Sequence, residues 1–314
     1  MTHTVWVGDC LEKLRSMKDE TVDCCITSPP YYGLRNYDGK CRWWGGILDC
    51  GHEEKEKFCI KCGAWFGELG LEHSMHQFIE HLVEIFNEVK RVLKPNGTVW
   101  INIGDTYLNS GAGNKKPSGF QQNSQASKAG AYPQHSKQRR YPKAKGLKTK
   151  DMCLIPHRLV IALQDDGWWI RNDIIWAKPN PMPESVRDRL TKSHEHIFLL
   201  AKSKKYNFDI DAIKEERIDG KGLRNKRDVW NITQKSFKGA HFATYPPDLI
   251  EPCVLAGCPV DGLILDPFAG SGTTAGVAEV FNRNSLMIEL NPEYAKLIPA
   301  RIEDIKKYYE VSDL

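Results

Sequence analysis

Apolar and polar residues are arranged along this chain in a way that predicts strands alternating with helices. Short apolar runs that suit buried strands lie at 4–7, 22–26, 98–103, 168–176, 196–200, 262–265 and 286–288. Helical spacing of apolar residues covers 10–17, 75–93 and 248–256, and Pro156 suits the first turn of a further helix. This alternation predicts a doubly wound, mostly parallel α/β sheet with helices on both faces.

Local signals set the ends of several of these elements. Asp9 is a plausible N-cap for the helix at 10–17, and Lys94-Pro95-Asn96-Gly97 is expected to end the helix at 75–93. Trp168 and Trp169 are both expected in the core, and the apolar helical pattern around Cys253 predicts a buried thiol. Because most strands of the sheet are predicted to be parallel, their carboxyl ends should meet along one edge of it.

Composition narrows the class of protein. The 314 residues are enough for one large α/β core or two modest domains, and the formal net charge of +4 does not by itself indicate a nucleic-acid binder. Neither a signal-peptide pattern after Met1 nor a membrane-spanning apolar run is visible, so we expect a cytoplasmic protein that uses no membrane. Its ten cysteines are then expected to be reduced or metal-bound.

The strand at 22–26 leads directly into Thr27-Ser28-Pro29-Pro30-Tyr31. The two prolines have no N–H to give to a sheet, so the chain must leave the strand in a rigid turn that we expect to be exposed. Its hydroxyl and carbonyl oxygens can accept hydrogen bonds from the exocyclic amine of a base, while the Tyr31 ring can stack on the base. Such acceptors favour a pyramidal amine nitrogen and free its lone pair, a gain made in the transition state. The alternative is a proline-stiffened loop without function.

A second motif lies near the other end of the chain. The run from Gly262 to Thr274, with Asp266-Pro267-Phe268-Ala269-Gly270-Ser271-Gly272, predicts a strand, a glycine turn and a helix start. Asp266 stands at the strand end, where it can bind an amine or a cation. Glu289 ends the next strand a little over twenty residues later, a spacing that suits an acid reaching a nucleotide ribose.

With these two motifs the chain resembles the DNA amino-methyltransferases that use S-adenosylmethionine. Ser28 to Tyr31 is similar to their catalytic motif and Asp266 to Thr274 to their cofactor motif, in the order of the permuted beta group. The resemblance implies a catalytic set of Ser28, Pro29, Pro30 and Tyr31. It implies a cofactor-binding set of Asp9, Cys10, Thr27, His241, Phe242, Asp266, Phe268, Gly270, Ser271, Gly272, Thr273 and Glu289. Within that set, Asp9 would contact the adenosine end of the cofactor.

The resemblance also implies double-stranded DNA as the partner and, in some settings, a cognate restriction endonuclease. Trp176, Lys178 and Asn180 lie in the loop that would line the target-base pocket. A serine before the two prolines favours N4 of cytosine over N6 of adenine. An RNA amino-methyltransferase, a DNA-binding module that has lost catalysis, and a carbon-methylating enzyme that uses Cys253 are the alternatives. The sequence leaves the oligomeric state open.

An insert at 40–67 carries Cys50, His52, Cys59 and Cys62. The Cys-x-x-Cys pair followed by glycine is typical of a zinc knuckle, and four ligands would make a closed structural site. Cys41 competes with His52 for the fourth position, and free thiols in a loop are the alternative. Zinc would stabilise an insert too small to bury a core of its own.

Two basic stretches complete the predicted organisation. Residues 114–150 hold ten Lys and Arg and no acid, and 202–238 is also rich in charge. We interpret the first as a basic loop that becomes ordered on DNA and the second as a target-recognition region, the alternative in each case being a solvated surface segment. The predicted methyltransferase core comprises 1–39, 68–113, 151–201 and 239–314.

Overall fold

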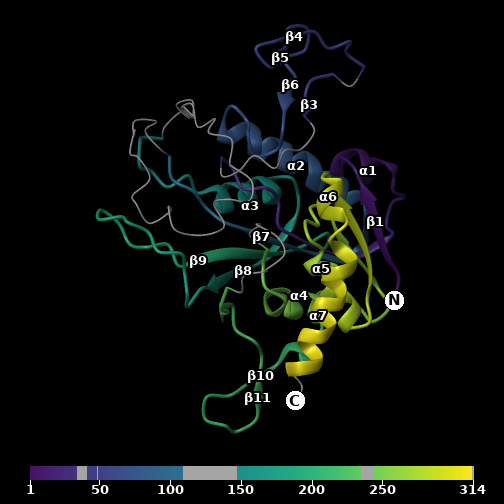
Figure 1. Ribbon diagram of the computed structural model, residues 1–314, viewed down its shortest axis with the longest axis vertical. Coiled ribbons are helices and arrows are strands. Elements are labelled where there is room, and N and C mark those ends of the chain that lie inside the picture. The colour runs from purple at the N-terminus through teal and green to yellow at the C-terminus, as the bar shows by residue number, and fades with distance from the viewer. Residues whose placement is uncertain (34–40, 48, 109–146, 235–243, 313–314) are drawn as a thin grey trace.

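An eight-stranded sheet forms the centre of the molecule (Figure 1), as seen in the computed structural model, which describes residues 1–33, 41–47, 49–108, 147–234 and 244–312. The strand order is β1-β14-β13-β2-β7-β9-β8-β12. The strands are β1 (His3–Val7), β14 (Asn284–Glu289), β13 (Leu263–Asp266), β2 (Val22–Thr27), β7 (Leu93–Ile103), β9 (His194–Ala201), β8 (Trp169–Ala177) and β12 (Val229–Asn231). Among the described strands of this sheet, β9 runs against its neighbours and the other pairs are parallel. The predicted mostly parallel sheet is therefore confirmed.

Helices cover both faces because successive side chains of each strand point to opposite sides. Cys25 packs in the cluster that holds α1 (Cys10–Ser16), α2 (Met75–Val92) and α3 (Ile155–Asp165). Its neighbour Cys24 packs in the cluster with α4 (Pro247–Gly257), α5 (Thr273–Val280) and α7 (Ile298–Ser312). A short helix, α6 (Pro292–Ala295), follows β14. Among the described helices, none combines the length and the apolar character needed to cross a membrane.

Three local expectations differ from the structure. The helix ends before Lys94 as predicted, since α2 stops at Val92, but β7 begins at Leu93 instead of the predicted 98, with a register shift against β2. Trp168 is buried, but Trp169 is 47% exposed, since consecutive residues of a strand face opposite sides. The stretch 202–238 is not wholly separate from the core, because β12 pairs with β8 at the edge of the sheet.

Two small elements stand away from the central sheet. The insert forms a four-stranded antiparallel sheet in the order β3 (Arg42–Trp44), β6 (Trp65–Gly67), β5 (Phe58–Cys59) and β4 (Glu54–Lys55), at the top of Figure 1. At the opposite end lies the hairpin of β10 (Glu215–Glu216) and β11 (Leu223–Arg224), and the 3₁₀ turn (Asp211–Ile213) that precedes it packs against α4. Most of the predicted basic loop, residues 114–146, lies outside the described residues.

Candidate active site

The two motif-bearing turns lie side by side. β2 and β13 are parallel neighbours, with Cys25 opposite Leu265, so the turn after Thr27 and the turn after Asp266 leave the same edge of the sheet. The Thr27 hydroxyl donates a 2.7 Å hydrogen bond to Asp266 Oδ1 across that edge. Residues separated by 239 positions in the chain are thus joined directly at the site.

Asp266 is held entirely by groups of the protein. Besides Thr27, its carboxylate accepts hydrogen bonds from Thr274 Oγ1 (2.6 Å), the Phe268 N–H (3.0 Å) and the Tyr245 hydroxyl (3.1 Å). Burial raises the pKa of Asp266, while these donors oppose the rise. The side chain is 1% exposed, so its contacts fix the start of the glycine turn.

The glycine turn leaves room for a ligand to approach its backbone. Gly270 has φ +53°, and a Cβ built there would meet no atom within 4 Å, so it would project into open space. Gly272 has φ +89°, and a Cβ there would come within 2.8 Å of Ile298. The Ser271 hydroxyl oxygen is buried without a hydrogen-bond partner among the described residues. A buried polar atom beside an open cradle is what a small-molecule site at this turn requires.

Glu289 ends β14, the next strand of the sheet. Its Oε2 accepts a hydrogen bond from the Gly270 N–H (2.7 Å) and its Oε1 accepts one from the Asn291 N–H (2.8 Å). Burial raises the pKa of this carboxyl to about 7, although both backbone donors lower it. Glu289 is therefore an acid at the edge of the glycine turn that exchanges its proton near neutral pH.

Asp9 follows β1, whose last residue pairs with Glu289. Its Oδ1 accepts a hydrogen bond from the Glu12 N–H (2.9 Å), which confirms the predicted N-cap of α1, and also forms an ion pair with Arg42. The side chain of Cys10 packs in the core beneath α1, and burial raises the pKa of its thiol. Asp9, Glu289 and the glycine turn thus lie at the ends of three adjacent strands.

The turn from Ser28 to Tyr31, which is predicted to be catalytic and is called the catalytic turn below, is less exposed than its sequence suggests. Pro29 is buried, and Ser28, Pro30 and Tyr31 are each partly buried. Ser28 is partly buried, and its hydroxyl takes part in no hydrogen bond among the described residues, so it can bond to a substrate. The Tyr31 ring lies against Gly104, where a Cβ would come within 2.7 Å of the ring. The turn therefore combines a rigid backbone, a hydroxyl open to a ligand and a fixed aromatic ring.

Glu195 completes this corner, and our interpretation of the sequence missed it. The Tyr31 hydroxyl donates a 2.8 Å hydrogen bond to Glu195 Oε2, while Lys178 Nζ lies 2.5 Å from Oε1. Lys178 also stands 4.0 Å above the ring of Trp176, and burial lowers its pKa against the influence of Glu195. Because β9 runs antiparallel, Glu195 near its start lies at the same edge as the strand ends that carry the motifs, and this pairing direction is not visible in the local sequence.

The other residues of the predicted target pocket differ in how far they are buried. Trp176 is 3% exposed and donates a hydrogen bond to Ile232, so its ring belongs to the core more than to an open pocket. Asn180 is exposed and donates a hydrogen bond to the Gln234 carbonyl. His241 and Phe242 lie outside the described residues. Cys253 is fully buried in α4, as expected, so it does not line the site.

The four predicted metal ligands come together in the insert. Cys50 Sγ lies 3.8 Å from Cys59 Sγ and Cys62 Sγ lies 3.4 Å from His52 Nδ1, with all four ligand atoms within 4.8 Å of one another. A tetrahedral zinc with bonds of about 2.3 Å to sulfur and about 2.0 Å to nitrogen needs separations of about 3.8 and 3.5 Å. Burial would raise the pKa of Cys59, but hydrogen bonds from His52 and backbone N–H groups lower it to about 5. The donor set therefore fits zinc, and Cys41 is exposed and outside the cluster.

Comparisons with known proteins match these motifs to one family. A family model described as DNA methylase matches residues 22–299. The chain is similar to Type II methyltransferase M.Cfr9I of Citrobacter freundii, with 44% identity over 300 residues that cover 96% of this chain and 87% of that protein.

Solved structures share the fold. The PvuII DNA methyltransferase, described as cytosine-N4-specific, aligns with a TM-score of 0.64 at 19% identity and covers 98% of this chain and 92% of its own. A putative DNA modification methylase of Thermus thermophilus, complexed with S-adenosyl-L-methionine, aligns with a TM-score of 0.59 at 21% identity, over 98% of this chain and 96% of its own. Because their sequence identities to this chain are only 19% and 21%, these two structures support the fold and nothing more specific.

Proposed function

The chain belongs to the DNA methylase family, and we propose that it methylates the exocyclic N4 amine of a cytosine flipped out of double-stranded DNA. As a member of that family it is a DNA amino-methyltransferase that uses S-adenosylmethionine. The observation that carries the proposal is the direct contact between Thr27 and Asp266, because it brings the catalytic turn beside the glycine turn. A base held at the first turn would then face a cofactor held at the second.

The residues of the catalytic turn suit an amine nucleophile. Ser28 would accept a hydrogen bond from the amine, together with the Pro29 carbonyl, and so favour a pyramidal nitrogen as the reaction proceeds. The Tyr31 ring would stack on the flipped base, with its orientation fixed by Glu195 and Gly104. The amine proton can leave to solvent, so the site needs no general base. Serine before the two prolines supports cytosine, and adenine N6 is the other outcome that the experiment below tests.

The residues present fit S-adenosylmethionine, which supplies an electrophilic methyl group on a sulfonium sulfur when bound. Gly270, Ser271 and Gly272 would hold it along the open cradle, with Phe268 and Thr273 beside them. Glu289 would accept hydrogen bonds from the ribose hydroxyls and Asp9 from the adenosine end. Cys10, Thr27 and Asp266 would shape the pocket from beneath, since each is buried and packed or bonded within the protein. His241 and Phe242 would complete it.

We also propose a structural zinc held by Cys50, His52, Cys59 and Cys62. The separations of their ligand atoms support a closed four-coordinate site with no open position for chemistry. Because the insert is small, metal binding would supply much of its folding free energy.

DNA would be held by the two basic stretches, 114–150 and 202–238, through contacts to phosphates. The similarity to a Type II methyltransferase supports a role in restriction-modification. A cognate restriction endonuclease that reads the same sequence is then the partner that we propose.

One experiment tests the target base directly. The purified protein is incubated with duplex DNA and methyl-labelled S-adenosylmethionine, the DNA is digested to nucleosides, and the labelled product is identified by mass and retention time. We expect N4-methyldeoxycytidine. A product of N6-methyldeoxyadenosine would overturn the cytosine assignment while leaving the family chemistry intact. Preferential labelling of a structured RNA competitor would overturn DNA as the substrate.

A further inference from the structure

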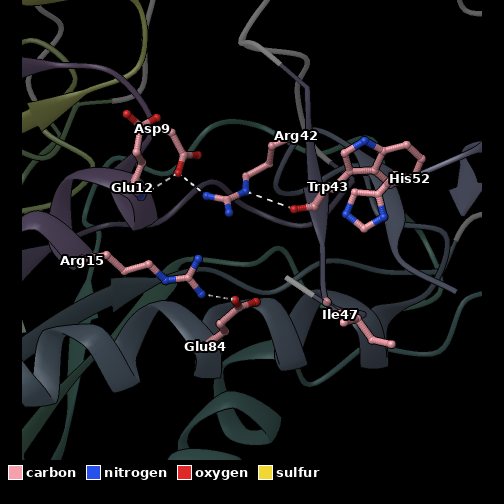
Figure 2. Close-up of a pocket in the computed structure, with 9 residues that line it drawn as sticks. Asp9, Glu12, Arg15, Arg42, Trp43, Ile47, His52 and Glu84 are labelled. Atoms are coloured by element: carbon pink, nitrogen blue, oxygen red, sulfur yellow. Dashed lines mark hydrogen bonds and ion pairs between the residues drawn. The ribbon is translucent and has the colours of Figure 1, made fainter. Parts of the chain in front are cut away.

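The zinc-binding insert contacts the methyltransferase core beside the predicted cofactor site. Arg42, on edge strand β3 of the insert, forms an ion pair with Asp9, which follows β1 of the central sheet (Figure 2). Both side chains are about three-quarters buried, at 24% and 21% exposure, so water screens this pair less than a fully exposed one. The insert therefore supplies a cation to a carboxylate at the adenosine end of the site.

A short series of contacts leads from the metal cluster to this pair. The ring of His52, one of the four predicted ligands, stacks on Trp43 with ring centroids 4.6 Å apart. The carbonyl of Trp43 accepts a hydrogen bond from Arg42 Nε (3.2 Å). The guanidinium of Arg42 also lies 4.8 Å above the ring of Trp44.

Backbone pairing adds a second connection between the metal cluster and Arg42. β3 pairs with β6, which pairs with β5, the strand that ends at Cys59. Cys59 of the cluster and Arg42 therefore belong to one small sheet, so the position of Arg42 depends on the same fold that the metal would stabilise.

Asp9 has one carboxylate oxygen available for a ligand. Its Oδ1 receives both the Glu12 N–H and Arg42, while Oδ2 makes no hydrogen bond to another described residue. β1 pairs with β14, and Val7 at the end of β1 lies opposite Glu289. An adenine amine presented to Oδ2 would thus be close to the acid expected to bind the ribose.

The Arg42–Asp9 ion pair lies at the edge of an open cavity. A space of about 410 Å³ separates this face of the insert from α1 and α2, and its lining includes Asp9, Arg42, Trp43 and His52. Figure 2 shows the Arg42–Asp9 pair on one side of this space and the Arg15–Glu84 pair on the other. The Arg42 side chain borders open space, whereas Trp44 on the same strand is buried and stacks on His81 of α2, so close packing holds the strand but not the guanidinium.

We propose that Arg42 is a positioning residue for the cofactor, and that zinc binding in the insert holds it against Asp9. Arg42 fixes the carboxylate so that Oδ2 faces the adenosine end, and loss of the metal releases it. Zinc and S-adenosylmethionine are then coupled ligands of one chain, each raising the affinity for the other by the same factor. This inference rests on the cofactor and zinc sites proposed above.

The test measures cofactor affinity by calorimetry and zinc content by mass spectrometry in the same samples. In the wild-type protein we expect removal of zinc by a chelator to weaken S-adenosylmethionine binding about fivefold or more, the lower end of ordinary coupling between sites. Arg42→Ala should weaken binding by a similar factor while keeping its zinc. Removing zinc from Arg42→Ala should then change the affinity little, because the coupling passes through the residue already lost.

Arg15→Ala is the matched control. Arg15 lines the same cavity and pairs with Glu84 at 2.9 Å, but it has no contact with Asp9, so its cofactor affinity and its response to zinc should equal those of the wild type. The reciprocal measurement needs no variant: zinc affinity, measured against a chromogenic chelator, should rise by the same factor when S-adenosylmethionine is present.

The possible results separate this inference from the proposed function. Unchanged cofactor affinity in Arg42→Ala, or an equal loss on zinc removal in Arg42→Ala and the wild type, would overturn the coupling and leave the methyltransferase assignment untouched. A wild-type protein that binds the cofactor but takes up no zinc would overturn the metal half of the inference. Failure of the wild type to bind S-adenosylmethionine at all would overturn the proposed cofactor site together with the coupling.

Discussion

The Thr27 hydroxyl donates a 2.7 Å hydrogen bond to Asp266 Oδ1, and this bond joins the ends of two parallel strands that carry different motifs. Thr27 is followed by the Ser-Pro-Pro-Tyr turn and Asp266 by the glycine turn. Both side chains are 1% exposed, so the contact is strong and fixed in place. If the base and the cofactor bind as proposed above, the geometry between them would depend on this buried hydroxyl–carboxylate pair.

Replacing Thr27 with Val should damage catalysis through that pair. Valine keeps the shape but removes one of four donors to a buried carboxylate, so we expect a loss of about 1–2 kcal/mol in the free energy of unfolding. Methyl transfer should fall more than stability explains, since the two turns lose their direct connection. Denaturant unfolding and single-turnover methylation measure the two effects.

Thr98→Val is the control for this change. Thr98 is also fully buried and its hydroxyl donates to the Gly257 carbonyl, but that bond lies away from both turns. It should lose similar stability and keep its methylation rate at temperatures where it is folded. Equal losses of rate in the two variants would contradict a special role for Thr27.

The sequence contained enough information for the sheet and for both turns. Apolar runs long enough for strands, each followed by a strong turn or cap signal, identify β2 and β13, and parallel alternation implies that their ends share one edge. The sequence also predicted that Cys50, His52, Cys59 and Cys62 would gather in one cluster, because Cys-x-x-Cys spacing is a local property, and zinc binding by that cluster stays a prediction. Asp9 as a helix cap is local in the same sense.

The sequence did not predict the side-chain contacts between residues that are distant along the chain. Glu195 meets Tyr31 only because β9 runs antiparallel beside β7, and β-pairing direction is not encoded locally. Arg42 meets Asp9 only because the fold brings β3 of the insert to the residue that caps α1. Trp169 is a large apolar residue and is therefore expected in the core, but side chains alternate along a strand, so Trp169 faces away from Trp168 and is exposed.

Ser28→Ala should separate catalysis from cofactor binding. The Ser28 hydroxyl makes no hydrogen bond to other described residues, so its removal should leave the fold and the affinity for S-adenosylmethionine close to wild type. We expect the methylation rate to fall about tenfold to a hundredfold, less than the roughly hundredfold to thousandfold loss for one oxyanion-hole donor, because the Pro29 carbonyl would still accept from the amine. Calorimetry and single-turnover rates compare the two quantities, and an equal loss of both would argue against the assigned role.

Glu195→Gln should slow methylation through Tyr31. The neutral amide would hold the Tyr31 hydroxyl less firmly than the carboxylate does and would leave the partly buried Lys178 ammonium without its counter-ion. We expect a fall in rate with unchanged cofactor affinity, and Tyr31→Phe should add little in that background because both changes break the same contact. A double-mutant cycle on the single-turnover rate measures this.

Glu251→Gln offers a matched control for the Glu195 experiment. Its carboxylate accepts a 2.9 Å hydrogen bond from the Tyr309 hydroxyl, the same kind of pair on the face of the sheet covered by α4 and α7. The methylation rate should not change in this variant. Strict additivity of Glu195→Gln and Tyr31→Phe would contradict the positioning role.

Glu289 should give cofactor binding a pH dependence. Burial raises the pKa of its carboxyl from 4.5 to about 7, and the ribose hydroxyls would donate to the ionised form. Affinity for S-adenosylmethionine should therefore rise as the pH increases from 6 to 8, by up to about tenfold per unit below the pKa. Calorimetry across this range measures it, and Glu289→Gln should flatten the profile.

The same pKa has the opposite consequence for the protein without cofactor. Because the folded state holds this proton more tightly than the unfolded state, the stability that it contributes is fully present below about pH 4.5 and is lost as the pH rises from there through about 7. The unfolding free energy should fall over that window in the wild type and less so in Glu289→Gln. Glu12→Gln removes an exposed acid near Asp9 and should change neither profile.

Zinc removal should unfold the insert and leave the central sheet folded. The strands β4 and β5 are two residues each and the insert has few buried side chains, so four metal–ligand bonds would contribute much of its stability. Limited proteolysis after chelation should cut within 41–67 while the flanking fragments stay associated.

Cys41→Ser should keep one zinc per chain and resist cleavage, because Cys41 lies outside the cluster. His52→Ala and Cys59→Ser should lose both the zinc and the resistance to cleavage, because both residues belong to the cluster. Zinc loss in Cys41→Ser with retention in His52→Ala would reverse the assignment of the fourth ligand.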